Sequence, residues 1–282
     1  MTLSAQHPEI QAVLDGESDG CIVCADCLDV LPLLPDGCVP VIWTDPPYGH
    51  GNMDGDLQAA RVRDSVAGGR KAIAEPIQND VQENMWPMLK IAISQFGRVL
   101  VPDCCCCCCC CSGGGGPTVT FAKLACQMDV RPLRFFHAVV WDKSHRGNGM
   151  GWRFRRNYEF VMVAHHQNGK LRWANLDKAI PNVFRCAPPR IRQHPNEKPL
   201  ELVEYFLEAA SLPADIILDP FCGSGTTCVA AKKLGRRWIG IEISEEYCET
   251  ARRRVASTPK PLFAEPEAKA EQAELFGKGG EI

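Results

Sequence analysis

One stretch near the carboxyl end, residues 215–242, constrains the fold more than any other part of this chain. It holds an apolar run, a segment with two closely spaced glycines, a run of helix-forming residues and a second apolar run. This order predicts a strand, a turn, a helix and a second strand. Parallel strands joined by a helix occur almost only in sheets that helices cover on both faces. We therefore expect an α/β fold built on a mostly parallel sheet.

The glycine segment of this stretch also predicts a cofactor site. Gly223 and Gly225 follow the first strand and would let a ligand approach the backbone closely. Glu242 ends the second strand, near the place where an acidic residue accepts hydrogen bonds from both ribose hydroxyls. Cys228 stands where a dinucleotide-binding motif has its third glycine. The pattern is therefore of the Rossmann type and favours a cofactor that lacks phosphates.

A second candidate site, residues 44–49, follows another apolar run that predicts a strand. Pro46 and Pro47 lack N–H groups, but their carbonyl oxygens remain hydrogen-bond acceptors. Asp45 adds a carboxylate and Tyr48 adds an aromatic ring. Two acceptors beside a ring suit a planar base whose exocyclic amine donates to the acceptors while the base stacks. These four residues are our catalytic candidates, and a proline turn with a core tyrosine is the alternative interpretation.

The cysteines are numerous, and eight of the 17 form one uninterrupted run, residues 104–111. Neighbouring side chains of a strand point to opposite faces, so disulfides within the run would have poor geometry. We interpret the run as a buried central strand in which cysteine serves as a small apolar residue, with a metal or redox tract as the alternative. Cys21, Cys24 and Cys27 have a spacing known from metal sites, but the first two fall in a predicted strand, residues 20–26. A reducing compartment fits this use of cysteine best.

The net charge is −3, but the positive residues are concentrated in one part of the chain. Residues 131–198 contain 14 Lys and Arg against 4 Asp and Glu. Such a basic block is the electrostatic footprint of a phosphate-binding surface. Within it, a glycine-rich loop interleaves cations with aromatic rings, which suits phosphate contact and base stacking, although an exposed hairpin loop would look similar. The candidate nucleic-acid-binding residues are Lys143, Arg146, Trp152, Arg153, Arg155 and Arg156.

Together these segments resemble the amino-methylating DNA methyltransferases, which modify adenine N6 or cytosine N4. Residues 219–227 are similar to the family's S-adenosylmethionine-binding motif, and residues 44–49 to its catalytic motif. The pairs His194-Pro195 and Lys198-Pro199 resemble the segment that precedes the cofactor strand. The catalytic motif comes first and the cofactor motif last, which is the permuted order called the beta class. The resemblance extends over about residues 20–255.

This resemblance implies a Rossmann-like, doubly wound, mostly parallel seven-stranded sheet with one antiparallel hairpin. It implies S-adenosylmethionine as cofactor, double-stranded DNA as partner and a target base flipped out of the duplex. Asp45 and the Pro46 carbonyl would hold the target amine while Tyr48 stacks on the base, and the methyl group would pass in line. Adenine N6 is the preferred target because the family uses Asp-Pro-Pro-Tyr mainly on adenine. The alternatives are cytosine N4, an RNA or protein-amide substrate, and a catalytically inactive DNA-binding module.

The cofactor site receives its candidate residues from the same two sources, the residue pattern and the resemblance. Asp26 ends the predicted strand at residues 20–26, where it could accept a hydrogen bond from the adenine amine of the cofactor. A helix-capping aspartate would occupy the same place. No metal is expected. The candidate cofactor residues are Asp26, Lys198, Asp219, Phe221, Gly223, Gly225, Thr226 and Glu242.

We expect one methyltransferase domain, residues 1–255, with a long loop at residues 50–80 and a target-recognition region at about residues 142–193. Residues 256–282 are rich in Pro, Glu, Ala and Lys, which predicts a flexible tail. Within the tail, Gln272, Leu275 and Phe276 resemble the peptides by which bacterial DNA enzymes dock on the replication sliding clamp. The alternatives are a chance amphipathic fragment and a fragment that packs back on the domain.

The chain shows no apolar run long enough for a membrane span, and its start lacks a signal-peptide pattern. Together with the cysteine usage and the family resemblance, this predicts a cytoplasmic protein that is bacterial or phage-encoded.

Overall fold

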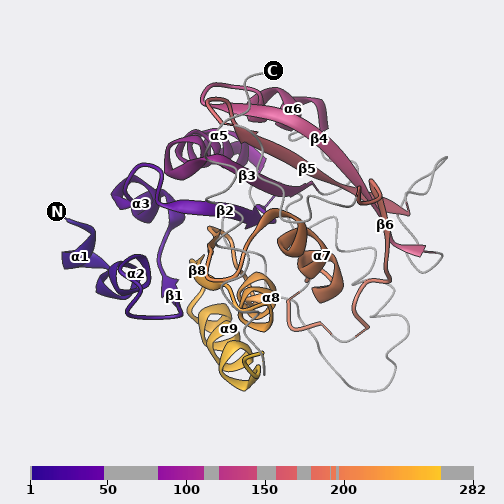
Figure 1. Ribbon diagram of the computed structural model, residues 1–282. Coiled ribbons are helices and arrows are strands. Elements are labelled where there is room, and N and C mark those ends of the chain that lie inside the picture. Colours follow the sequence, from indigo (N-terminus) through magenta and orange to yellow (C-terminus); the bar gives the residue numbers. More distant parts are fainter. Residues whose placement is uncertain are drawn as a thin grey trace, which may run out of the picture.

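The computed structural model describes residues 2–47, 82–110, 121–144, 157–169, 179–190, 192–194 and 197–261. In these residues, eight strands form one sheet in the order β1-β8-β7-β2-β3-β5-β4-β6 (Figure 1). Among them β5 alone is antiparallel to its neighbours, β3 and β4. The strands are β1 (Gly20–Cys24), β2 (Val39–Thr44), β3 (Leu100–Cys110), β4 (Leu133–Asp142), β5 (Tyr158–His166), β6 (Val183–Arg185), β7 (Ile216–Asp219) and β8 (Arg237–Glu242). The helices are α1 (Leu3–Gln6), α2 (Pro8–Leu14), α3 (Cys27–Val30), the 3-10 turn η1 (Leu31–Leu33), α5 (Gln82–Val99), α6 (Phe121–Met128), α7 (Leu200–Ala210), α8 (Thr226–Lys233) and α9 (Glu245–Ser257).

The sheet differs in strand number from the expected seven-stranded sheet. The strand that was not anticipated, β6, has three residues and pairs parallel with the end of β4, where Phe184 lies opposite Trp141. It lies at the edge of the sheet, and two of its three side chains are exposed. A run this short shows no clear alternation of buried and exposed residues, so its sequence carries no strand pattern. The expectation of seven strands is therefore wrong, whereas the mostly parallel α/β arrangement is confirmed, with β4 and β5 as its antiparallel hairpin.

The cysteine run occupies the place that was predicted for it. The backbone of residues 104–110 lies in β3, between β2 and β5. Cys108 lies opposite Thr44 of β2 on one side and opposite Met162 of β5 on the other. The prediction of a central strand is thereby confirmed. Cys21 and Cys24 also lie in a strand, β1, as expected.

Helices cover both faces of the sheet, which makes the fold doubly wound (Figure 1). On one face α2, α3, α5 and α6 pack into a hydrophobic cluster that includes Val30, Leu89 and Leu124. On the other face α7, α8 and α9 form a second cluster that includes Leu202 and Ala230. Burial of these apolar faces is the main stabilising contribution to such a three-layer fold.

The two short amino-terminal helices, α1 and α2, were not predicted. Ile10 and Val13 of α2 are fully buried and belong to the first hydrophobic cluster. The segment before β1 is therefore part of the core. Four and seven residues are too few for a clear helical period, which explains why the sequence pattern did not reveal these helices.

The register of the parallel strands brings the predicted acidic site residues together at the carboxyl ends of the strands. Glu242 of β8 lies opposite the end of β1, two residues before Asp26. Asp219 ends β7, and Asp45 directly follows β2, the strand beside it. Ligands of open α/β sheets bind at the carboxyl ends of the strands. The four acidic residues are therefore placed where the fold positions a site.

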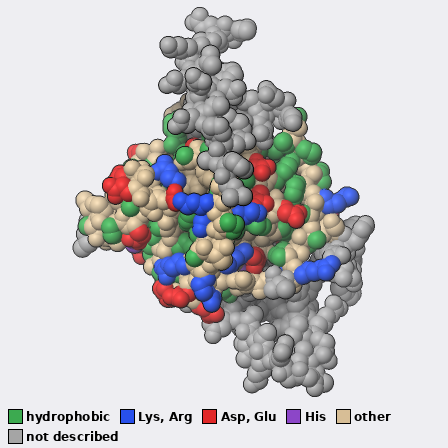
Figure 2. Space-filling model, turned by 60° about the horizontal axis from the view of Figure 1, so that its bottom comes forward, with side chains coloured by type: hydrophobic (Ala, Val, Ile, Leu, Met, Phe, Trp, Pro, Cys, Tyr) green, Lys and Arg blue, Asp and Glu red, His purple; other side chains and the backbone are tan. Residues whose placement is uncertain are grey.

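The described surface is mixed in charge on the face shown in Figure 2. Lys and Arg side chains are interspersed there with Asp and Glu side chains, as on an ordinary solvated surface. Arg146, Trp152, Arg153, Arg155 and Arg156, the centre of the predicted basic loop, lie outside the described residues. Among the helices that the structure describes, none is both long and apolar enough to span a membrane.

Candidate active site

Asp219 joins the two predicted motifs. Its carboxylate, at the end of β7, is only 3% exposed and accepts hydrogen bonds from both of them. The hydroxyl of Thr44, the residue before the catalytic candidates, donates to Oδ1 over 2.9 Å. Thr227 Oγ1 donates to Oδ2 over 2.5 Å, and the Phe221 N–H donates to Oδ1 over 3.1 Å. Burial raises the pKa of Asp219 to about 7, and these hydrogen bonds oppose that rise. Asp219 thus fixes β2 against the glycine loop.

The glycine loop depends on two glycines with left-handed backbone. Gly223 has φ +49° and Gly225 has φ +80°, a region that side chains with a Cβ rarely adopt. A Cβ on Gly225 would also lie 2.7 Å from the Cβ of Ala251 in α9. The Gly223 N–H donates to Glu242 Oε2 over 2.9 Å. The loop is therefore held between α9 and the end of β8.

Glu242 supports the loop and the start of α9 at once. Its Oε1 accepts a hydrogen bond from the Ser244 N–H over 2.9 Å, while Oε2 accepts the one from Gly223. Burial raises the pKa of this half-buried carboxyl, and these backbone donors oppose that rise. A carboxylate oxygen has two lone-pair sites, so each can still accept a hydroxyl. The ribose contact stays a prediction.

Asp26 caps a helix in this structure. Its Oδ1 accepts a hydrogen bond from the Leu28 N–H over 2.9 Å at the start of α3, which confirms the capping alternative. The Ala25 N–H donates to the Glu242 carbonyl over 2.9 Å, so Asp26 lies close to the end of β8. Contact with a cofactor amine stays a prediction.

Asp45, the main catalytic candidate, has two unlike carboxylate oxygens. Oδ2 accepts a hydrogen bond from Lys198 Nζ over 2.6 Å. Oδ1 is buried and has no hydrogen-bond partner among the described residues. Burial raises the pKa of Asp45 to about 6, with the Lys198 ammonium acting against the rise. Pro46 and Pro47 follow directly, whereas Tyr48 lies outside the described residues.

Lys198 and its neighbour Glu197 face two different parts of the site. Lys198 was predicted to bind cofactor, but its ammonium contacts Asp45, and its cofactor role stays a prediction. Glu197 forms an ion pair with Arg254 of α9 over 2.7 Å. The same guanidinium donates to the Ser224 carbonyl over 2.8 Å and so touches the glycine loop. The segment before α7 therefore connects the catalytic carboxylate to the loop.

A comparison with protein families fits this arrangement. Residues 39–253 match the model of the N6/N4 DNA methylase family, a span that includes both motifs and most of the chain. The chain belongs to this family. Its catalytic motif precedes its cofactor motif, as the beta-class resemblance implied.

Two curated relatives of this DNA methylase come from bacteria. A protein of Escherichia coli (strain K12) named as a methylase, YubD, is 29% identical over 237 residues, which cover 84% of this chain and 90% of YubD. The type II methyltransferase M2.DpnII of Streptococcus pneumoniae is 52% identical over 137 residues, or 43% of this chain and 51% of M2.DpnII. Among solved structures, the M1.HpyAVI–SAM complex superposes with a TM-score of 0.57 at 24% identity, covering 84% of this chain and 98% of the other. That likeness shows that the fold is shared.

Sequence reasoning about this DNA methylase missed Glu159, which lies beside the site, and Arg254, which contacts the glycine loop. Glu159 lies in β5, is 7% exposed and forms ion pairs with Lys143 and with Lys198. Lys143 was predicted to bind nucleic acid, but its ammonium contacts Glu159 and lies 4.9 Å from the centre of the Trp141 ring. The available signal for Glu159 was a single acidic residue inside an apolar strand, because a buried carboxylate needs a charged partner.

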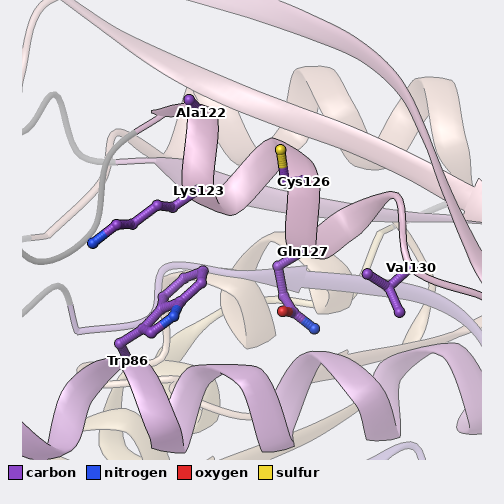
Figure 3. Close-up of a pocket in the computed structure, with 6 residues that line it drawn as sticks. All are labelled: Trp86, Ala122, Lys123, Cys126, Gln127 and Val130. Atoms are coloured by element: carbon purple, nitrogen blue, oxygen red, sulfur yellow. The ribbon is translucent and has the colours of Figure 1, made fainter.

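A surface hollow between α5 and α6 does not belong to this site (Figure 3). It measures about 420 Å³, and Trp86 of α5 closes one side while Lys123, Cys126 and Gln127 of α6 line the other. None of the predicted catalytic or cofactor residues lines it. We therefore place the active site at the carboxyl ends of β1, β8, β7 and β2 and not in this hollow.

Replacing Gly225 by Ala should destabilise this DNA methylase more than the same change at Gly235. Both glycines are left-handed, with φ +80° and φ +70°, so each Ala variant should lose about 1 kcal/mol through backbone strain. At Gly225 the new Cβ would also overlap Ala251, which should cost at least about 1 kcal/mol more. At Gly235 the one described atom that it would meet is Pro261 Cγ at 3.5 Å, an ordinary van der Waals contact. Denaturant unfolding measures both losses, and equal losses would mean that α9 does not confine the loop.

Proposed function

We propose that this DNA methylase transfers a methyl group from S-adenosylmethionine to the exocyclic N6 amine of adenine in double-stranded DNA, with the target base flipped out of the duplex. The observation that carries the proposal is the buried Oδ1 of Asp45 at the carboxyl end of β2, which has no hydrogen-bond partner in the described part of the chain. A buried carboxylate oxygen without a donor is unfavourable. An amine N–H of the target base would satisfy it.

The residues present fit the cofactor. Gly223 and Gly225 are left-handed and carry no side chain, so a ligand can approach the backbone at these two positions of the loop. Glu242 would accept the ribose hydroxyls and Asp26 the adenine amine, with Phe221 beside them. Asp219 and Thr226 flank the loop: Asp219 accepts hydrogen bonds from Phe221 and Thr227, and Thr226 accepts one from Arg254. When bound, the cofactor supplies an electrophilic methyl group.

The chain's own residues would orient the amine. Asp45 Oδ1 accepts one N–H of the amine and the Pro46 carbonyl accepts the other, which directs the nitrogen lone pair toward the methyl group. Tyr48 stacks on the base and fixes its plane. Because Asp45 has a pKa of about 6, its carboxylate form prevails at neutral pH and can accept the hydrogen bond. Positioning and electrostatics provide the acceleration without a covalent enzyme intermediate.

The choice of adenine rests on the Asp-Pro-Pro-Tyr sequence of the catalytic motif, which the family uses mainly on adenine. Cytosine N4 is the second candidate, since the matching family includes both chemistries. Sequencing of modified bases in DNA from methylation-deficient bacteria that express the chain tests the choice. We expect N6-methyladenine at one recurring site, and modification confined to cytosine N4 would replace the adenine assignment.

Contact with DNA is proposed for the basic loop. Replacing Arg153, Arg155 and Arg156 together should weaken DNA binding and flatten its salt dependence, because each phosphate that the protein no longer neutralises lowers the log–log slope by about 0.9. Replacing three exposed cations outside the basic block, Lys233, Arg252 and Lys260, is the matched control. Fluorescence titrations at several salt concentrations give the slope. A slope unchanged in the first variant would mean that this loop does not touch DNA.

Three broader parts of the proposal follow from the sequence. The type II methyltransferase M2.DpnII supports a place in a restriction–modification system. The bacterial relatives support a bacterial or phage-encoded protein that acts in the cytoplasm. Docking of Gln272, Leu275 and Phe276 on a sliding clamp is proposed from sequence alone, because these residues lie outside the described ones. A synthetic peptide of residues 266–282 should bind a bacterial clamp at roughly micromolar affinity, about −8 kcal/mol, and no binding would exclude the clamp.

A further inference from the structure

Four charged side chains of alternating sign form a row that ends at the catalytic candidate, Asp45. Lys143, just after β4, pairs with Glu159 of β5. The other oxygen of Glu159 lies 3.5 Å from Lys198 Nζ, and Lys198 Nζ lies 2.6 Å from Asp45 Oδ2. The row thus runs from the end of the β4–β5 hairpin to the end of β2. It contains two ammonium groups and two carboxylates.

The middle of this row is buried. Glu159 is 7% exposed and Lys198 is 8% exposed. Burying charged groups requires opposite charges nearby, and a buried ion pair often stabilises a fold no better than apolar residues would. Stability alone is therefore a weak reason for a carboxylate at position 159. Its position next to Lys198 gives a better one.

Lys198 lies between two carboxylates that compete for its ammonium group. The shorter contact is with Asp45 and the longer one with Glu159. Lys143 holds Glu159 from the other side and so fixes how strongly Glu159 attracts Lys198. Without Glu159, the pull on Lys198 that opposes Asp45 would be weaker. Lys198 would then neutralise Asp45 more completely and compete with a substrate amine for its oxygens.

We propose that Glu159, held by Lys143, is a positioning residue that draws Lys198 toward itself, so that Lys198 binds one oxygen of Asp45 and leaves the other for the target amine. That the free oxygen of Asp45 receives the target amine rests on the proposed function. The arrangement of the four charges does not depend on that function.

The charge balance at Asp45 agrees with this geometry. Among the described residues, the charged groups that face Asp45 are Lys198 before α7, Glu159 of β5, Lys143 after β4 and, from β7, Asp219. Burial raises the pKa of Asp45 to about 6, Lys198 and Lys143 act against that rise, and Glu159 adds to it. At Glu159 burial favours the neutral form, but the two ammonium groups outweigh it and hold its pKa below the usual range. Glu159 and Lys143 therefore act on Asp45 in opposite directions.

This opposition gives the test, which does not depend on methyl transfer. The carboxyl carbon of Asp45 is followed by NMR during a pH titration of the full chain labelled with ¹³C-aspartate, and Asp45→Asn identifies its signal. Glu159→Gln should move the Asp45 midpoint down and Lys143→Met should move it up, each by about one pH unit. Arg185→Met is the matched control, because it removes a cation next to the hairpin that pairs with Asp142 rather than with the row. Its midpoint should equal that of the unaltered chain.

The outcomes separate cleanly. Opposite shifts in the two variants support the positioning role, and shifts of the same sign or no shift overturn it. If Glu159→Gln does not fold, Lys143→Met decides alone, because an unchanged Asp45 midpoint in that variant would overturn the proposal. If the unaltered chain methylates no DNA, the proposed function fails while the titration still tests the row. In an active enzyme, the acid limb of the single-turnover rate should follow the same two directions.

Discussion

Replacing Asp45 by Ala should slow methyl transfer by about 10²–10⁴-fold. The variant loses the carboxylate that would hold the target amine and keeps only the Pro46 carbonyl of the two proposed acceptors. Cofactor affinity should change little, because the glycine loop is tied to Asp219, Glu242 and Arg254 rather than to Asp45. Single-turnover assays measure the rate, and calorimetry measures the dissociation constant for S-adenosylmethionine.

A matched control for this variant lies at the other end of the same strand. Asp36 precedes β2, and its side chain is 81% exposed and pairs with Arg98 at the surface. Asp36→Ala should therefore keep the rate of the unaltered enzyme. An Asp45→Ala variant that retains more than about a tenth of the rate, a loss below ~1.4 kcal/mol, would show that Asp45 does not hold the amine.

Replacing Glu242 by Ala should weaken S-adenosylmethionine binding by roughly 1.5–3 kcal/mol, the range of charge-assisted hydrogen bonds. The variant would lose the proposed ribose contact and also the acceptor that holds the Gly223 N–H. Both effects lower cofactor affinity. In calorimetry the dissociation constant should rise roughly 10- to 150-fold, which is the same range expressed as affinity.

The control for this second change is Glu246→Ala, an exposed acid in the first turn of α9. It lies on the solvent side and should leave cofactor affinity unchanged. An unchanged dissociation constant in Glu242→Ala would show that Glu242 does not bind the ribose of the cofactor.

The elements with long or regular patterns were predictable from the sequence because their cause is local. The cysteine run has the pattern of a strand, and the backbone of residues 104–110 forms β3. Gly223, Gly225 and Glu242 follow a spacing that a strand, a loop and a helix impose, and these elements are present. The seven-strand expectation was wrong because β6 gains its order from pairing with β4 and not from its own three residues.

The row of charges at the site could not be predicted from local sequence patterns. Asp45, Glu159 and Lys198 belong to distant parts of the sequence, and only the order of the sheet brings β2, β5 and the segment before α7 together. Lys143 is a second residue whose partner in the fold could not be read from its sequence neighbours. Its neighbours suggested contact with nucleic acid, whereas its partner in the fold is a buried carboxylate. The roles assigned to Tyr48 and to the basic loop stay predictions.

The central claim is that methyl groups pass to the N6 amine of adenine in DNA. The most direct measurement incubates the purified chain with double-stranded DNA and S-adenosylmethionine carrying a deuterated methyl group, digests the DNA to nucleosides and identifies the labelled nucleoside by mass spectrometry. We expect labelled N6-methyladenosine in its deoxy form with the unaltered chain and a strongly reduced amount with Asp45→Ala. Label confined to N4-methylcytosine, or absent from DNA, would contradict the claim.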